Sequence, residues 1–222
     1  MMERHFDEEL NHLKQKLLQM GDTAQEMIGL AIKSLVERKE SYAKEVFSLE
    51  EKVNHMEIEI EDEVLKLLAL RQPAARDLRL LTAVLKINND LERVADQAVN
   101  ISEISVYLLK EPSLKPLIDI PHMAQLAQRM IKNSLEAFVQ HDPKLAKEVC
   151  EDDDEVDRIN DQIFRELLTY MMEDAKSITR AVDLILVSRN LERIADHATN
   201  ISEDVVFIEE GKNIKHHIQD ET

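Results

Sequence analysis

Oxygen-bearing side chains, seven of them acidic, recur at four-residue spacing in four places, and this is the pattern in the sequence most able to do chemistry. Residues four apart lie on the same face of an α-helix, so each pair brings two side chains together. Crowded carboxylates resist joint ionisation, and a bound cation relieves their repulsion. Oxygen ligands suit hard cations, and an added histidine would favour iron or zinc. The four pairs are Glu50 and Asn54, Glu92 and Asp96, Asp153 and Asp157, and Glu192 and Asp196.

The expected turns of the chain bring these pairs together two by two. One helix pair turns about Pro73 and another between Asp174 and Ala175. In an antiparallel register, Glu50/Asn54 then lie beside Glu92/Asp96, and Asp153/Asp157 lie beside Glu192/Asp196. The register predicts two surface metal sites made of these eight residues. For either helix alone, a merely solvated acidic face is the simpler interpretation.

Other residue combinations point to no active site. His197 follows Asp196 and could add a nitrogen ligand, although a single histidine on a helix surface is more often a bystander. His12 and His55 have no motif that would support phosphotransfer. A di-iron enzyme of the ferritin type needs Glu-x-x-His on inward faces, and the sequence shows no such inward pair, no phosphate-binding loop and no nucleophile elbow. We predict that the protein is not an enzyme and has no catalytic residues.

Six amphipathic helices must position these side chains. Apolar residues recur every three or four positions, no stretch alternates with period two, and only three glycines and five prolines interrupt the pattern. Gly21 and Gly29 fall inside the first helix, where either a kink or a close helix contact would explain them. Gly211 ends the last helix. The predicted helices cover about residues 10–35, 46–67, 76–109, 122–140, 144–172 and 177–210.

The two halves of the chain are copies of each other. Leu91–Glu103 returns as Leu191–Glu203 with ten of thirteen positions identical and an offset of 100 residues. Upstream, Ala43–Val46 matches Ala146–Val149 at an offset of 103 residues. The sequence therefore predicts an all-α fold of two tandem three-helix bundles related by an internal repeat. The predicted boundaries are 1–110 for the first repeat, 111–121 for the proline-rich linker and 122–222 for the second repeat.

Charge and composition exclude several classes of function. With 28 Lys and Arg against 45 Asp and Glu, the net charge is −17, which disfavours nucleic acid and anionic membrane surfaces. Cys150 is the only cysteine, so the sequence has no internal disulfide and no thiolate zinc cluster. No signal peptide and no membrane-spanning segment are evident, which predicts a cytoplasmic protein without membrane insertion. Outward apolar residues predict a homodimer; the examples are Val99, Val106 and Phe207.

Several motifs, in this order, resemble those of the PhoU family. They are Arg71–Arg79 (RQPAARDLR), Asp90–Asp96 (DLERVAD), Arg189–His197 (RNLERIADH) and the closing Glu210-Gly211-Lys212. The resemblance covers nearly the whole chain and implies a cytoplasmic, usually dimeric regulator of phosphate uptake. It also implies two partners, a phosphate-specific ABC transporter and a sensor histidine kinase. With them, the protein holds the phosphate-starvation response off when phosphate is plentiful.

The resemblance further implies metal, because some family members carry iron or zinc clusters on Glu/Asp-x-x-x-Asp motifs. Asn54 departs from this pattern where the second repeat has Asp157, which makes the first site the weaker one. Two alternatives stay open. One is an accessory protein of a different phosphate carrier, and the other is a metal-storage or metalloenzyme bundle with inward ligands. The matching motif positions are Glu92/Asp96, Glu192/Asp196 and Asp153/Asp157.

Overall fold

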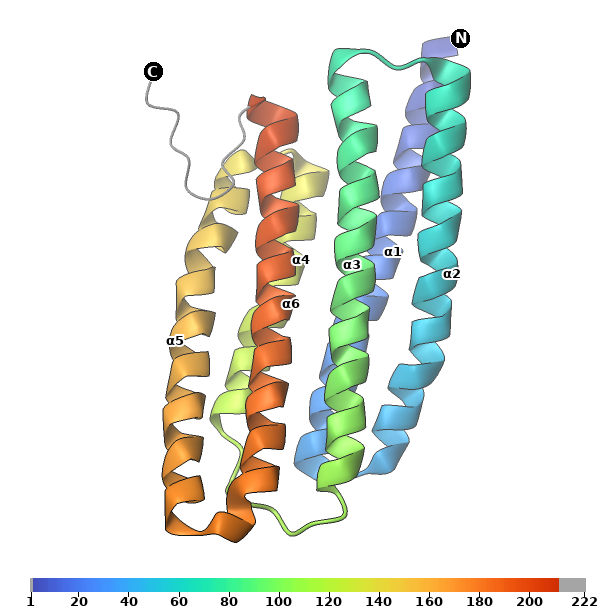
Figure 1. Cartoon of the computed structure of the whole chain (residues 1–222). Coiled ribbons are helices and arrows are strands. Elements are labelled where there is room, and N and C mark those ends of the chain that lie inside the picture. The colour runs from blue at the N-terminus through green and yellow to red at the C-terminus, as the bar shows by residue number, and fades with distance from the viewer. Residues whose placement is uncertain (1, 212–222) are drawn as a thin grey trace.

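Long antiparallel helices build the computed structural model, which describes residues 2–211 (Figure 1). Within these residues no strand occurs, so the predicted all-α fold is confirmed. Residues 212–222 of the predicted second repeat, including Lys212 of the closing motif, lie outside the described residues. The helices are α1 (Met2–Glu37), α2 (Glu40–Arg71), α3 (Ala75–Leu108), α4 (Asp119–Gln140), α5 (Pro143–Glu173) and α6 (Ile178–Glu210), with a short 3₁₀ turn, η1 (Ala175–Ser177), before α6.

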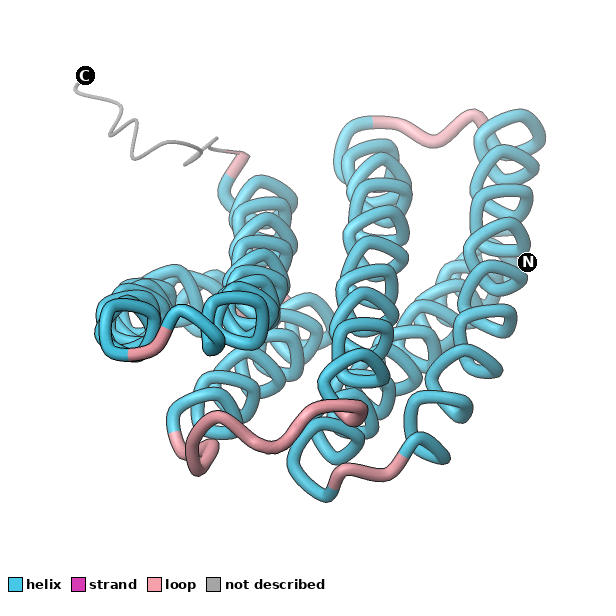
Figure 2. The backbone as a smooth tube through the Cα atoms, turned by 60° about the horizontal axis from the view of Figure 1, so that its bottom comes forward, coloured by secondary structure: helices cyan, strands magenta, loops and turns pink. Residues whose placement is uncertain are grey.

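The helices form two three-helix bundles that stand side by side, α1–α3 and α4–α6 (Figures 1 and 2). Each helix turns its apolar stripe inward, because burying that stripe is the main favourable term in folding. The bundles meet where α3 lies along α6 and α1 lies along α4, and one hydrophobic cluster runs through both. The largest fully buried side chains include Leu13, Met27, Ile60, Leu91, Ile101, Met123 and Phe138.

Three helices begin earlier than the sequence predicted: α1 at Met2 instead of about residue 10, α2 at Glu40 instead of about residue 46, and α4 three residues early. We expected α4 to begin at about His122, but it begins at Asp119 and takes Pro121 into its first turn. Proline is tolerated there because the first backbone N–H groups of a helix have no intrahelical partner. At the start of α5, by contrast, Asp142 caps the helix: its side chain accepts hydrogen bonds from the backbone N–H groups of Lys144 and Leu145, at 2.9 and 3.2 Å.

A close contact between α1 and α4 explains Gly21. A β-carbon at this position would overlap the side chain of Leu135, which is itself buried. Of the two explanations open from sequence, the structure therefore supports close helix contact. Gly29 lies further along α1, where an added β-carbon would be 3.3 Å from Nε2 of Gln128.

We expect Gly21→Val to lower the free energy of unfolding by about 2 kcal/mol, because the new side chain overpacks the junction between the bundles. Chemical denaturation measures this loss. Gly29→Ala is the matched control: its methyl group meets only the end of a glutamine side chain, and alanine favours the helix. An equal effect at both glycines would contradict the close contact at Gly21.

Polar side chains also join the two bundles. Nζ of Lys86 on α3 lies 2.9 Å from Oδ1 of Asp204 on α6, whose side chain is 3% exposed. Nδ1 of His197 lies 2.8 Å from Oδ1 of Asp90, and Asn200 also donates to that oxygen, at 3.3 Å. These contacts fix how α3 and α6 align.

The outward residues that motivated the predicted homodimer are not freely exposed. Val99, Val106 and Phe207 are all partly buried. Val99 packs against the core, and Nζ of Lys86 lies 5.8 Å from the centre of the Phe207 ring. The predicted exposure of these three side chains was wrong, because neighbouring side chains cover part of each of them. None of the described helices is long and apolar enough to span a bilayer.

Candidate functional site

The predicted metal ligands lie on the outer faces of two helix hairpins, α2–α3 and α5–α6. Along α5, Val149, Val156 and Ile163 are buried, whereas Asp153 is half-buried and Asp157 is exposed. This is the arrangement that helical periodicity predicts when apolar residues take the inner face. The carboxylates can therefore meet solvent and ions without entering the core.

The second-repeat cluster consists of Asp153, Asp157, Glu192 and Asp196, and the structure brings all four within electrostatic reach. Burial, followed by the charges of Asp157 and Asp196, raises the pKa of Asp153 to about 6. Burial is also the main cause that raises the pKa of the other three carboxyls, and the charge of Asp157 adds to it at Glu192 and Asp196. These carboxylates repel one another, and a bound cation would relieve that repulsion.

The first-repeat cluster includes an acid that the sequence prediction left out. Burial and the charge of Asp96 raise the pKa of Glu50, which agrees with the predicted register. Burial is the main cause that raises the pKa of Glu92, and among its α2 neighbours the charge that contributes is Glu57. Asn54 is exposed. Glu57 therefore adds its charge to this cluster beside the predicted residues, and the acidic stripe along α2 was the signal that could have identified it.

Arginine distinguishes the two clusters. Arg93 makes ion pairs with both first-cluster acids of its own helix, through Nε to Glu92 at 3.4 Å and through Nη1 to Asp96 at 3.5 Å. In the second cluster the arginines act only as charges: Arg189 and Arg193 lower the pKa of Glu192, and Arg193 lowers that of Asp196. Positive charge in the first cluster thus already offsets part of the repulsion that a metal would relieve, which sequence reasoning missed.

The donor set fits a cation by chemistry. Oxygen ligands predominate, and Oε2 of Glu92 is buried without a hydrogen bond, with only the ion pair to Nε of Arg93 to balance its charge. Within residues 2–211, however, no group of three or more His, Cys, Asp or Glu side chains is arranged so that it could hold an ion. The carboxylates would have to converge on binding, so the metal sites stay a prediction.

His197 lies between the two clusters. Its charge lowers the pKa of Glu92 in the first cluster and of Asp196 in the second. Nδ1 is engaged with Asp90 at 2.8 Å, so only Nε2 could serve as a ligand. A carboxylate that orients a histidine ring in this way is a common companion of histidine ligands.

We expect the metal-free protein to become more stable on mild acidification, and Asp153 to be one cause. A carboxyl with a raised pKa in the folded state destabilises that state when ionised, so the penalty is complete above about pH 6 and disappears as the pH falls towards the ordinary value of 3.8. Because the group is half-exposed, screening reduces the effect to about 1 kcal/mol. Urea unfolding at pH 7 and pH 5 measures it. In Asp153→Asn the increase in the free energy of unfolding from pH 7 to pH 5 should be smaller by about 1 kcal/mol. An increase equal to that of the parent protein would contradict the role assigned to Asp153.

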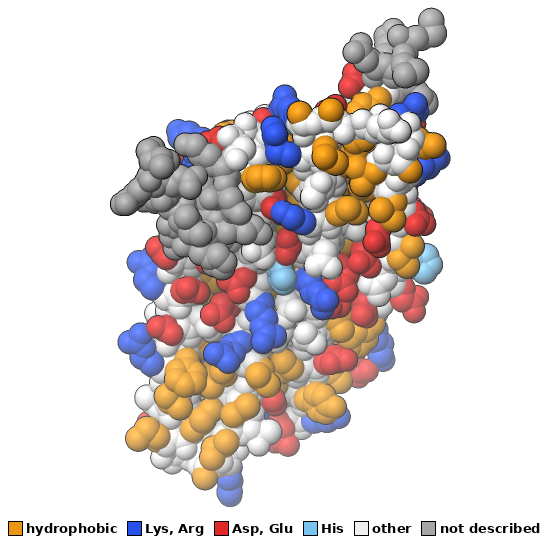
Figure 3. Space-filling model, turned by 45° about the horizontal axis from the view of Figure 1, so that its top comes forward, with side chains coloured by type: hydrophobic (Ala, Val, Ile, Leu, Met, Phe, Trp, Pro, Cys, Tyr) orange, Lys and Arg blue, Asp and Glu red, His pale blue; other side chains and the backbone are white. Residues whose placement is uncertain are grey.

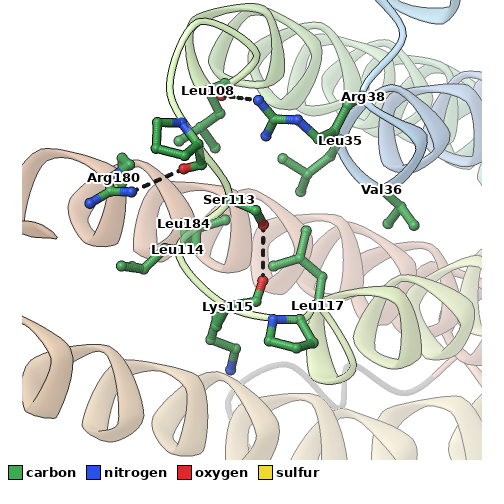
Figure 4. Close-up of a pocket in the computed structure, with 12 residues that line it drawn as sticks. Leu35, Val36, Arg38, Leu108, Ser113, Leu114, Lys115, Leu117, Arg180 and Leu184 are labelled. Carbon is green, nitrogen blue, oxygen red and sulfur yellow. Dashed lines mark hydrogen bonds between the residues drawn. The ribbon is translucent and has the colours of Figure 1, made fainter.

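A separate hollow lies between the bundles, where the linker crosses from α3 to α4 (Figure 4). Its cationic side chains already hold the linker. Nη2 of Arg38 donates to the carbonyls of Leu108 and Glu111, at 3.2 and 2.6 Å, and Arg180 donates to the carbonyl of Pro112 at 3.0 Å. The hollow therefore serves the junction of the repeats. Leucines supply most of its apolar wall: Leu35, Leu108, Leu114, Leu117 and Leu184.

Comparison with known proteins matches both repeats. A family model described as the PhoU domain matches residues 17–105 and again residues 120–205, one match on each bundle. The chain is 40% identical over 213 residues to the phosphate-specific transport system accessory protein PhoU homolog of Aquifex aeolicus, covering 96% of both proteins. It is 37% identical to the homolog of that name from Pseudomonas putida, covering 96% of this chain and 84% of the relative.

Solved structures share the fold. The crystal structure of PhoU from Pseudomonas aeruginosa superposes with a TM-score of 0.90 at 36% identity, covering 93% of this chain and all of that one. The phosphate transport system regulatory protein PhoU from Streptococcus pneumoniae gives a TM-score of 0.86 at 26% identity, covering 95% and 99%. The arrangement of two three-helix repeats is therefore common to all three.

Proposed function

This chain belongs to the PhoU family, as its motifs predicted, and from that premise we propose that it is a regulatory accessory protein of phosphate uptake. It works in the cytoplasm with a phosphate-specific ABC transporter and a sensor histidine kinase, and it holds the phosphate-starvation response off when phosphate is plentiful. The observation that carries the proposal is that the similarity spans both repeats and nearly the whole chain. A regulatory role agrees with the names of the relatives, which are accessory proteins of phosphate transport.

The proposal includes a homodimer and surface metal. Iron or zinc would be held chiefly by Asp153, Asp157, Glu192 and Asp196, with Glu50, Asn54, Glu92 and Asp96 as the weaker set. Bound there, the metal would supply the positive charge that these carboxylates lack. The outward position of the ligands argues against the alternative of a storage or enzyme bundle, which requires ligands on inward faces.

The test uses bacterial cells that lack their own PhoU-family protein and carry a reporter of the phosphate-starvation response. We expect expression of this chain to repress the reporter in phosphate-rich medium, and the repression to disappear in cells that also lack the phosphate ABC transporter. Repression that persists without that transporter would favour a different phosphate carrier as partner. An unchanged reporter, with the protein present at normal levels, would contradict the proposal.

A further inference from the structure

An exposed apolar patch lies at the turn end of the α5–α6 hairpin. Its members recur at four-residue steps on each helix, so each set forms a stripe along one helix face. All six side chains are between 39% and 87% exposed, and Met172 is the most exposed. Figure 3 shows hydrophobic side chains gathered at the lower left of the face, over this end of the hairpin. The patch consists of Phe164, Leu168 and Met172 on α5 and Ile178, Val182 and Leu186 on α6.

The two stripes lie level with each other. Because the hairpin turns at Asp174 and Ala175, Leu168 is opposite Val182, and the other members pair in the same way on either side. The patch is therefore a flat apolar surface two helices wide. With about 150–250 Å² offered by a fully exposed aromatic side chain and somewhat less by the aliphatic ones, it exposes on the order of 500 Å². That is at the upper end for a monomeric protein and is typical of an interaction site.

The first repeat provides an internal control for this patch. The equivalent positions, 103 residues earlier on α2 and 100 residues earlier on α3, keep only two large apolar side chains, Leu65 and Leu78. The same fold is thus built in the first repeat with polar residues at three of the six positions and alanine at a fourth. Packing within the bundle does not require the patch. The four other counterparts are Glu61, Ala69, Thr82 and Lys86.

We propose that this α5–α6 patch is the surface through which two copies of the chain associate, face to face, as a four-helix contact. The inference rests on the homodimer of the proposed function and names the surface that forms it. A flat patch on two antiparallel helices is self-complementary under a two-fold axis, which is the commonest symmetry of soluble oligomers. Two such patches bury on the order of 1,000 Å² of apolar surface before any polar rim is added, which approaches the standard interface size.

The charge of the chain is compatible with self-association at this place. The acids of the second cluster nearest to the patch are Asp157, seven residues before Phe164, and Glu192, six residues after Leu186, which is about 9–11 Å along each helix. This exceeds the Debye length of about 8 Å at physiological ionic strength, so repulsion between the clusters of two copies is screened. Charged residues that border the patch are of both signs: Asp161, Arg165, Asp183 and Arg189.

Sedimentation equilibrium of the full chain tests the proposal. We expect a species of twice the 25.7 kDa chain mass at micromolar concentration. Phe164→Glu should weaken the dimer at least tenfold, and the fold should tolerate it because the first repeat has Glu61 at the same position. Leu168→Glu should act similarly. Its matched control is Leu65→Glu, a leucine at the equivalent position of the first repeat that is 52% exposed against 39% for Leu168, and this substitution should leave the dimer intact.

Salt provides a second measurement. Because both copies carry a net charge of −17, raising sodium chloride from 0.05 to 0.5 M should tighten an association held by apolar surface. A monomer at every concentration, a dimer that Phe164→Glu does not weaken, equal loss with Leu65→Glu, or dissociation as salt rises would each overturn the proposal. The reporter assay in cells is independent of all four outcomes, so a failure here is distinguishable from a failure of the regulatory function.

Discussion

Lys86→Leu is expected to lower the free energy of unfolding by about 3 kcal/mol, although the lysine side chain is almost half exposed. The reason lies in its partner. Asp204 is 3% exposed, and Nζ of Lys86 lies 2.9 Å from its Oδ1. Removing one member of a buried ion pair leaves the other charge buried and uncompensated, which is far more costly than the pair itself is worth.

The internal repeat supplies the variant that should rescue this loss. The counterpart of Lys86 in the second repeat is Leu186, and the counterpart of Asp204 in the first repeat is Ile104. Asp204→Ile alone should cost little, since the lysine left behind can reach water. The double variant Lys86→Leu/Asp204→Ile places apolar residues on both sides, and we expect its stability to return to within about 1 kcal/mol of the parent.

Chemical denaturation of the parent, both single variants and the double variant forms a complete thermodynamic cycle. The asymmetry is the decisive feature: Lys86→Leu should destabilise strongly and Asp204→Ile weakly. Equal losses from the two single variants, or a double variant as unstable as Lys86→Leu alone, would mean that the buried charge of Asp204 is not what the lysine compensates.

The sequence was informative about features that arise within one helix or one repeat. Apolar periodicity predicted the six helices, and Pro73 and the Asp174–Ala175 turn predicted which carboxylates share a level. It also predicted that Gly21 needed a special reason. These features follow from backbone geometry and helical spacing, both of which are local.

Features that depend on how the two repeats pack together could not be read from the sequence. The pairing of Lys86 with Asp204 joins residues 118 positions apart, and no pattern within either helix predicts it. Val99 was expected on an outer face, but it is partly buried and packs against the core, which no pattern within α3 alone predicts. Arg93 is similar: its ion pairs to Glu92 and Asp96 depend on the rotamer of a long side chain.

The difference between the two acidic clusters leads to the second large effect, which concerns metal. We expect chelation to lower the melting temperature of protein purified without an affinity tag, and added iron or zinc to restore it. A ligand that binds only the folded state stabilises it by about 2.7 kcal/mol at a hundredfold excess over its dissociation constant. For a chain of this length that corresponds to about 5–10 °C.

Asp196→Asn tests whether the second-repeat cluster is responsible. The substitution keeps the shape of the side chain but removes one of the charges that raise the pKa of Asp153. It should therefore weaken metal binding and at the same time raise the melting temperature of the metal-free protein, a combination that general damage to the fold does not produce.

The matched control is Asp96→Asn in the first repeat. Its effects should be smaller, because Arg93 already lies 3.5 Å from Asp96 and Asn54 brings no charge. Elemental analysis and the melting curves together test the site. If the protein contains no bound transition metal, and if neither chelator nor either substitution changes its melting temperature, these carboxylates form only a solvated face.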